Sequence, residues 1–147
     1  MIVRQIPQED LAALLELYRH LHEADDQRAN VAMENAVWEE ICANPRYRYV
    51  GAYVGDLLVA SCTITLIPNL TRACRPYGVI ENVVTHADYR GKGIGREVLK
   101  SALNHAWAND CYKVMLLTGR LNEQTFRFYE SAGFDRHGKQ AFIVRKP

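Results

Sequence analysis

The sequence has few cysteines, and none of them form the C-x-x-C pair of metal or redox motifs. The four cysteines, at positions 42, 62, 74 and 111, are far apart in the chain. This spacing argues against a zinc site and against a disulfide framework. We therefore expect reduced thiols in a cytoplasmic protein, and no metal.

Net charge and long apolar runs are lacking as well. The 18 Lys and Arg residues nearly balance the 17 Asp and Glu residues, for a formal net charge of +1. Such a chain has no global field to attract nucleic acid or an anionic membrane, and it has no stripe of interleaved aromatic and basic residues. No stretch approaches the length of a transmembrane helix, and the N-terminus lacks the apolar run of a signal peptide. We expect neither a nucleic-acid partner nor a membrane partner.

The composition that remains is that of an ordinary globular domain. Of the 147 residues, 48% are hydrophobic and 24% are charged. A chain of this length is one domain by the usual prior, and it can bury a core without disulfides or metals. We therefore treat residues 1–147 as a single domain.

The pattern of apolar residues predicts an α/β fold. Strands are expected at 1–6, 47–54, 57–67, 77–85, 112–118 and 140–144, with a tight hairpin turn at Gly55-Asp56. Helices are expected at 8–22, around Met33 to Ile41, from Ile94 to Trp107 and at 122–131, with loops at 22–28 and 68–76. This order predicts a mixed central β-sheet flanked by about four helices.

The most informative segment is a basic, glycine-rich turn between a strand and a helix, Arg90-Gly91-Lys92-Gly93-Ile94-Gly95-Arg96. Glycines at alternate positions let backbone N–H groups approach an anion, and the helix N-terminus adds free donors and a positive dipole end. Arg90, Lys92 and Arg96 add charge-assisted contacts. The string fits neither the Walker loop nor the dinucleotide fingerprint G-x-G-x-x-G. A turn that only caps a helix is the simpler alternative, but the coincidence of turn, charge and helix favours a diphosphate site.

This string resembles the acetyl-CoA signature of the GNAT superfamily of N-acetyltransferases, Arg/Gln-x-x-Gly-x-Gly/Ala. A second stretch, Asn122 to Phe134, is similar to the superfamily's N-x-x-A-x-x-x-Y-x-x-x-G-F helix, with Thr125 where a small Ala is usual. Within the superfamily, residues 78–84 and 111–113 are locally similar to glucosamine-6-phosphate N-acetyltransferases. The resemblance implies that acetyl-CoA is the co-substrate and contacts Val83, Val84, Thr85, Arg90, Gly91, Lys92, Gly93, Ile94, Gly95, Arg96, Asn122 and Tyr129.

The resemblance also places two candidate catalytic residues, Tyr129 and Glu81. A tyrosine, with a pKa near 10, can protonate a departing thiolate whose thiol has a pKa of about 8.5. Glu81 could take the proton of the attacking amine directly or through water, particularly where partial burial raises its pKa. The alternatives are a packing role for Tyr129 and, for Glu81, a salt bridge or a substrate contact.

The resemblance further implies a β-bulge around Val83 that separates this strand from the strand at 112–118, with pantetheine in the gap. A bulge frees backbone groups that a regular ladder would use, and a backbone N–H near Val83 is then the expected oxyanion donor.

The acceptor amine is expected between the first two helices and the loop at 68–76. These segments carry Asp25, Asp26, Arg28, Arg72, Arg75 and Tyr77, near Glu81. The arginines could bind a phosphate or carboxylate of the acceptor, although loop charges are more often solvated. We expect an acetyltransferase for a small amine, with an amino sugar phosphate as one option. A protein N-acetyltransferase and a non-catalytic coenzyme A-binding regulator are the alternatives, and a homodimer is compatible with the resemblance.

Four further side chains are expected to have structural roles only. His86 has no partner at metal spacing and is expected at the surface or at a helix cap. Cys111 is expected to be a buried thiol, and Trp38 and Trp107 are expected in the core.

Overall fold

Five strands form one mixed sheet in a computed structural model, which describes residues 1–22 and 28–147. The strands lie side by side in chain order: β1 (Ile2–Gln5), β2 (Tyr47–Val54), β3 (Leu57–Ile67), β4 (Tyr77–Thr85) and β5 (Val114–Leu116). Neighbours are antiparallel except β4 and β5, which are parallel. A parallel pair needs a crossover, and the longest helix of the chain lies between these two strands.

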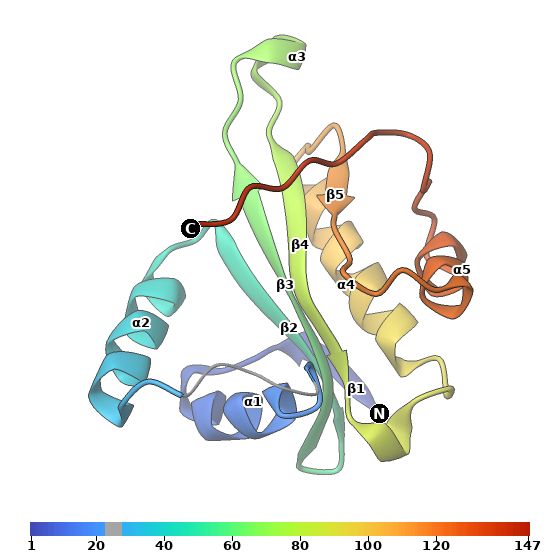
Figure 1. The fold of residues 1–147 in the computed structure, drawn as a ribbon. Helices are drawn as coiled ribbons and strands as arrows, with labels where there is room; N and C mark the ends of the chain where they lie inside the picture. Colours follow the sequence, from blue (N-terminus) through green and yellow to red (C-terminus); the bar gives the residue numbers. More distant parts are fainter. Residues whose placement is uncertain (23–27) are drawn as a thin grey trace.

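Helices cover both faces of this sheet (Figure 1). On one face lie α1 (Leu11–Tyr18), preceded by the 3₁₀ turn η1 (Gln8–Asp10), and α2 (Val31–Ala43). On the other lie α4 (Ile94–Ala108) and α5 (Glu123–Ser131). Each face has its own buried cluster, one around Leu14, Trp38 and Val84 and one around Ile80 and Leu99. The predicted fold class, an α/β domain with a mixed sheet, is therefore confirmed.

Three connections between elements complete the fold. The β2–β3 turn contains Gly55 at φ 59°, a left-handed conformation that glycine adopts without steric cost, as the Gly55-Asp56 pair predicts. The β3–β4 hairpin ends in the short element α3 (Thr71–Cys74), at the far end of the sheet from the β2–β3 turn (Figure 1). Another 3₁₀ turn, η2 (Ala87–Tyr89), follows β4 and leads to the glycine-rich loop.

The predicted strand at 140–144 is wrong. These residues have no strand partner in the described part of the chain, and Phe142 and Val144 are exposed at 89% and 96%. A strand exists only where a neighbour supplies a hydrogen-bonding ladder, and the edge strand β5 is three residues long. Alternating apolar residues at 140–144 are therefore not sufficient to predict a strand there.

Two other predicted elements are shorter than expected, and one of them is the strand predicted at 112–118, which extends only over Val114–Leu116. The helix predicted at 8–22 is α-helical only over Leu11–Tyr18, because its last turn tightens through the bonds His20 N–H to Leu17 O and Leu21 N–H to Tyr18 O. Most of the loop predicted at 22–28, including Asp25 and Asp26, lies outside the described residues.

Candidate functional site

The glycine-rich loop has the backbone conformation that anion binding requires. Gly91 and Gly93 have φ values of 72° and 77°, and Gly93 is the N-cap of α4. A Cβ placed on either residue would meet no atom within 4 Å, so the space above the loop is open. Among the described residues, the N–H groups of Gly91 to Gly95 have no protein acceptor. These free donors point to a site for an anionic group at the start of α4.

Gly95 has a different role from the other two glycines of the loop. A Cβ at this position would lie 3.1 Å from Thr85 Oγ1 and 3.2 Å from Phe128 Cζ. Gly95 therefore allows the first turn of α4 to pack closely against β4 and α5. The glycine spacing of the motif thus leaves open space above Gly91 and Gly93 and allows close helix packing at Gly95.

The three basic side chains of the loop differ in their contacts with the rest of the protein. Arg90 donates to Thr85 O and to His20 O, both at 3.1 Å, which ties the loop to the end of β4 and to the end of α1. Lys92 is exposed, with its Nζ 5.0 Å from the Tyr89 ring centroid. Arg96 is exposed on the first turn of α4. Lys92 and Arg96 are therefore free to meet an anion, whereas Arg90 is engaged with backbone carbonyls.

β4 carries the bulge that the resemblance implies. Thr63 pairs with Glu81 and Ser61 with Val84, so one residue of β3 is opposite two residues of β4, Asn82 and Val83. Asn82 adopts φ 52°, a conformation that Asn tolerates better than most side chains. In the sequence, only the residue type of Asn82 indicates this conformation, because Asn adopts positive φ more readily than most residues.

Beyond the bulge, β4 separates from β5. The two strands pair only from Gly78 to Ile80 and from Val114 to Leu116. Val83, Val84 and Thr85 therefore lie on a segment of β4 that β5 does not pair with. We call this separation the splay. It is a place where backbone donors remain for a ligand.

Glu81 and Tyr129 lie close enough to interact electrostatically. Glu81 is exposed on β4 at the bulge, contrary to the partial burial considered from the sequence. Tyr129, on α5, is half-buried and packs against Phe128 and Phe134, with ring centroids 5.0 and 6.2 Å away. Burial raises the pKa of the Tyr129 hydroxyl, Arg120 opposes this shift, and the Glu81 carboxylate adds to it. Tyr129 therefore packs against the core from α5, and its hydroxyl also responds to the charge of Glu81.

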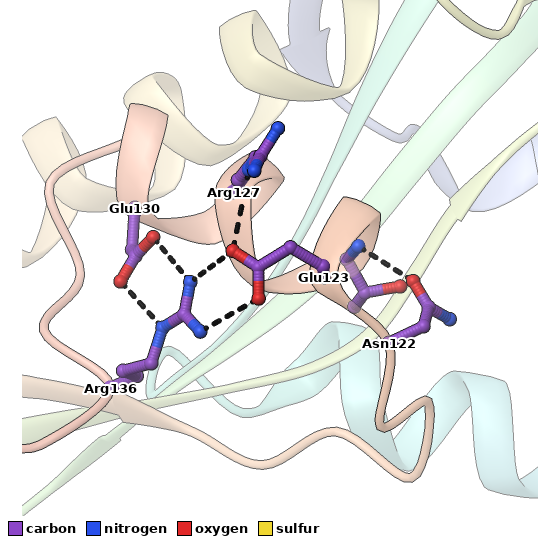
Figure 2. Close-up of polar contacts among 6 residues, drawn as sticks. Asn122, Glu123, Arg127, Glu130 and Arg136 are labelled. Carbon is purple, nitrogen blue, oxygen red and sulfur yellow. Dashed lines mark hydrogen bonds and ion pairs between the residues drawn. The ribbon is translucent and has the colours of Figure 1, made fainter.

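An ion-pair network fixes the helix that carries Tyr129 (Figure 2). Arg136 donates to Glu130 at 2.6 and 2.7 Å and to Glu123 at 3.1 and 3.0 Å, and Arg127 reaches Glu123 at 3.3 Å. The Arg136 guanidinium lowers the pKa of both carboxyl groups. Asn122, predicted to contact the coenzyme, caps α5 by accepting from the Thr125 N–H at 2.9 Å.

On the face of the sheet that carries α1 and α2, a groove of about 290 Å³ lies between the two helices. Its lining is mostly apolar and includes Tyr18, Met33, Val37, Trp38 and Tyr49. Tyr49 and Glu81 are both opposite Thr63, from the two neighbouring strands, so the groove lies near the bulge. Glu34, at its edge, forms a bidentate ion pair with Arg28 at 2.8 and 2.7 Å.

The structure does not bring the predicted acceptor-binding arginines together. Arg28 lies just before α2, whereas Arg72 and Arg75 lie on the β3–β4 hairpin tip, beyond the opposite end of β4 from the loop. Arg75 binds Asp110 at 3.2 Å, and Arg72 lies 5.7 Å from the Tyr112 ring centroid. Tyr77 packs edge-on against Tyr112. Of the predicted acceptor-binding residues that the structure describes, only Glu81 lies at the bulge.

Of the four side chains expected to have structural roles only, three lie as predicted and Trp107 does not. In the part of the chain that the structure describes, no group of three or more His, Cys, Asp or Glu side chains is arranged to hold a metal ion. Cys111 and Trp38 are buried, and His86 caps η2 by accepting from the Asp88 N–H, as expected. Trp107 is 50% exposed, so its predicted core position is wrong; it lies on the rim of a groove between α4 and α5. No helix over the described ranges 1–22 and 28–147 has the length and apolar character to span a bilayer.

Comparison with known proteins assigns a family. A model described as "Acetyltransferase (GNAT) family" matches residues 11–134. A glucosamine 6-phosphate N-acetyltransferase from Trypanosoma brucei brucei is 32% identical over 94% of this chain and 91% of its own length. A spermine/spermidine N(1)-acetyltransferase from Bacillus subtilis (strain 168) is 24% identical over 98% of this chain and 93% of its own. The solved structure of a putative acetyltransferase from Agrobacterium tumefaciens, 41% identical, superimposes with a TM-score of 0.92 over 99% of this chain and 100% of its own.

Proposed function

The chain belongs to the acetyltransferase (GNAT) family, and we propose that it transfers an acetyl group from acetyl-CoA to the primary amine of a small molecule by direct attack in a ternary complex. The observation that carries this proposal is the arrangement around the splay. Free N–H donors at the start of α4 lie at one end of it, and Glu81 and Tyr129 lie within electrostatic reach of each other.

The loop would hold the pyrophosphate of acetyl-CoA through the N–H groups of Gly91 to Gly95, with Lys92 and Arg96 adding charge. The thioester would then lie in the splay, where a backbone N–H near Val83 could stabilise the oxyanion. No metal is needed for this chemistry, because the thioester is already activated.

Glu81 and Tyr129 would move the two protons of the reaction. The amine must lose a proton as its nitrogen bonds to the carbonyl carbon, and the exposed Glu81 carboxylate can accept it directly or through water. The C–S bond then breaks, and the Tyr129 hydroxyl can protonate the departing thiolate. Solvent then reprotonates Tyr129 and removes the proton from Glu81, which restores the starting state of both residues.

For the acceptor, we propose glucosamine 6-phosphate as the first compound to test, because a relative that matches over nearly the whole chain bears that activity in its name. The groove between α1 and α2 would hold the acceptor next to Glu81. Arg28, which pairs with Glu34 at the edge of this groove, could turn from that carboxylate to a phosphate. Arg72 and Arg75 lie at the other end of β4 and do not support an acceptor role.

The decisive experiment is an assay of acetyl-CoA-dependent thiol release with a panel of amines, including glucosamine 6-phosphate, spermine and a peptide with a free N-terminus. We expect turnover with at least one small amine. We expect Glu81→Gln to lower the rate at neutral pH and to regain part of it at high pH, where the free amine is abundant. A loss that is uniform across pH would make Glu81 a substrate contact instead of a base.

Two results would overturn the proposal as a whole. The absence of thiol release with every amine, in a protein that still binds acetyl-CoA, would favour a non-catalytic regulator. Turnover with the peptide alone would favour a protein N-acetyltransferase.

A further inference from the structure

A carboxylate marks one edge of the groove between α1 and α2. Glu34 lines this groove, and its side chain is only 12% exposed. Its partner Arg28 is 62% exposed, so solvent reaches the guanidinium far more easily than the carboxylate. The hydrogen bonds from Arg28 lower the pKa of Glu34, which keeps the carboxylate charged at neutral pH. The groove therefore carries a negative charge whose partner is an exposed side chain.

The interior of the groove is apolar and aromatic. Tyr18, Trp38 and Tyr49 line it, and the Trp38 and Tyr49 rings pack edge-to-face with their centroids 5.1 Å apart. The Trp38 ring N–H is already engaged, because it donates to Gln8 O at 2.8 Å. Such a lining suits methylene chains and, through the faces of its rings, cationic groups. The hydroxyl groups of a sugar would find few partners there.

The groove leads from Glu34 toward the proposed base, Glu81. α2 packs beside β2, and α1 packs over β3 and β4 (Figure 1). Glu34 lies one helical turn before Trp38, a rise of about 6 Å. Tyr49 and Glu81 are both opposite Thr63, so the three side chains share one face of the sheet. Two strand spacings, or about 10 Å, separate Tyr49 from Glu81. Two carboxylates therefore flank an apolar path that runs from α2 to β4.

The negative charge of the groove distinguishes between two kinds of acceptor. A phosphate would have to draw Arg28 away from Glu34, which would leave a little-exposed carboxylate unpaired beside a second negative charge. An ammonium group would instead take the place of the guanidinium and keep the carboxylate paired. The groove thus favours an acceptor whose second charged group is positive.

We propose that the acceptor is an aliphatic diamine or polyamine, with one amine acetylated beside Glu81 and a second ammonium replacing Arg28 on Glu34. Its methylene chain lies along the aromatic lining of the groove. The inference rests on the proposed function and names the substrate class for it.

The test compares α,ω-diamines, from putrescine to diaminododecane, with the monoamines of the same chain length. Each pair shares a methylene chain and differs in one ammonium group. Values of kcat and KM are measured for these amines and for glucosamine 6-phosphate, with the full native chain and its variants. Glu34→Gln removes the negative charge, Glu34→Asp keeps it, and Arg28→Met removes the competing cation. Glu40→Gln is the matched control, because Glu40 is an exposed glutamate elsewhere on α2.

We expect the best diamine to have a kcat/KM about 10- to 100-fold above that of its monoamine, the range for one interaction with a charged group. Glu34→Gln should remove this advantage, mainly through a higher KM, and Glu34→Asp should retain part of it. Arg28→Met should lower the KM for the diamine, because the competing guanidinium is gone. Glu40→Gln should match the native chain. Melting temperatures identify any variant that does not fold, and Arg28→Met carries the test where Glu34→Gln fails to fold.

Three outcomes would overturn the inference: equal kcat/KM for every diamine and its monoamine, an advantage that persists in Glu34→Gln, or a loss of glucosamine 6-phosphate acetylation in Arg28→Met. The last result would show that Arg28 binds a phosphate. A native chain that acetylates none of these amines would count against the proposed function instead, so the two failures are distinguishable.

Discussion

At the level of single residues, the loop glycines have conformations that other residues tolerate poorly. Gly93 has φ 77° and would leave an added Cβ in open space, so a substitution would strain the backbone and obstruct the proposed anion site, with no clash inside the protein. A left-handed conformation is a clear outlier for a β-branched residue.

We predict that Gly93→Val lowers acetyl-CoA affinity by more than about tenfold, since both the backbone donors and the approach path are disturbed. Gly55→Val is the matched control, because Gly55 has a similar φ of 59° and also has open space around it, but lies in the β2–β3 turn. Calorimetric titration of both variants checks this. Equal affinity of Gly93→Val and Gly55→Val for acetyl-CoA would contradict a pyrophosphate site at the loop.

Tyr129 presents the second question at this scale, because it is both a packed aromatic and a candidate acid. Tyr129→Phe keeps the ring that contacts Phe128 and Phe134 and removes the hydroxyl. We predict a fall in turnover of roughly 10²- to 10⁴-fold with acetyl-CoA affinity nearly unchanged. Single-turnover rates and dissociation constants on the same variant separate the two roles. A variant with full activity would leave Tyr129 as a packing residue.

At the level of elements, α5 depends on ion pairs at its surface. The pKa values of Glu123 and Glu130 are lower in the folded chain than their ordinary value, so their contribution to stability is present above about pH 4.3 and is lost as the pH falls through the folded-state pKa values. Because these groups are exposed, the effect is small.

We therefore predict that Arg136→Met lowers the melting temperature at pH 7 by about 2–4 °C, a shift of the size expected for a small stability change in a domain of this length. The difference from the native chain should narrow between about pH 5 and pH 3. Arg127→Met is the control, because Arg127 has a single, longer contact to Glu123. A melting difference that stays constant over this pH range would show that the network is not the cause.

The loop between β4 and α4 gives a prediction at the same scale, because its two basic residues differ. Arg90 binds uncharged carbonyls, so Arg90→Ala should weaken acetyl-CoA binding by displacing the loop, with little dependence on salt. Lys92→Ala should weaken it mainly at low salt, since its charge is exposed. Dissociation constants measured from about 0.01 to 1 M salt test this, as the Debye length falls from about 30 to 3 Å. A steep salt dependence for Arg90→Ala would restore it as a direct phosphate contact.

At the level of the whole molecule, the proposed coenzyme site joins elements from both faces of the sheet. The α1 turn, the loop before α4 and the segment before α5 meet there through Arg90 and Arg120. A ligand that binds only the folded chain stabilises it by mass action, by about 2.7 kcal/mol at a concentration of 100 times its dissociation constant.

We predict that acetyl-CoA at this concentration raises the melting temperature by about 5–11 °C. The rise should persist in Gly55→Val and fall to about half or less in Gly93→Val, because a tenfold loss of affinity leaves about 1.4 kcal/mol of stabilisation at the same concentration. A native chain whose melting temperature does not respond to acetyl-CoA would contradict the proposed site.

Sequence patterns were sufficient to predict most of the elements and to locate the glycine-rich loop that we propose binds phosphate. Apolar periodicity identified the three long strands, β2 to β4, and the helices α1, α2, α4 and α5, because burial on one face leaves a period of 2 or 3.6 residues that is local in the chain. The motif from Arg90 to Arg96 could also be recognised from sequence, because its glycines, its basic residues and the start of the helix are adjacent in the chain. Asn122 and Tyr129 were found only through resemblance to a known helix.

Tertiary structure decided what depends on partners that are distant in sequence. Residues 140–144 have the pattern of a strand but no ladder partner, and Trp107 is half-exposed although its helix is amphipathic. Arg90 turned out to bind main-chain carbonyls, and Arg120 meets Leu21 across 99 positions of the chain. Local patterns record which face of an element is apolar, but a hydrogen-bonding partner or a neighbouring charge is set by how the chain packs, and the interacting residues then leave no periodic signal in the sequence.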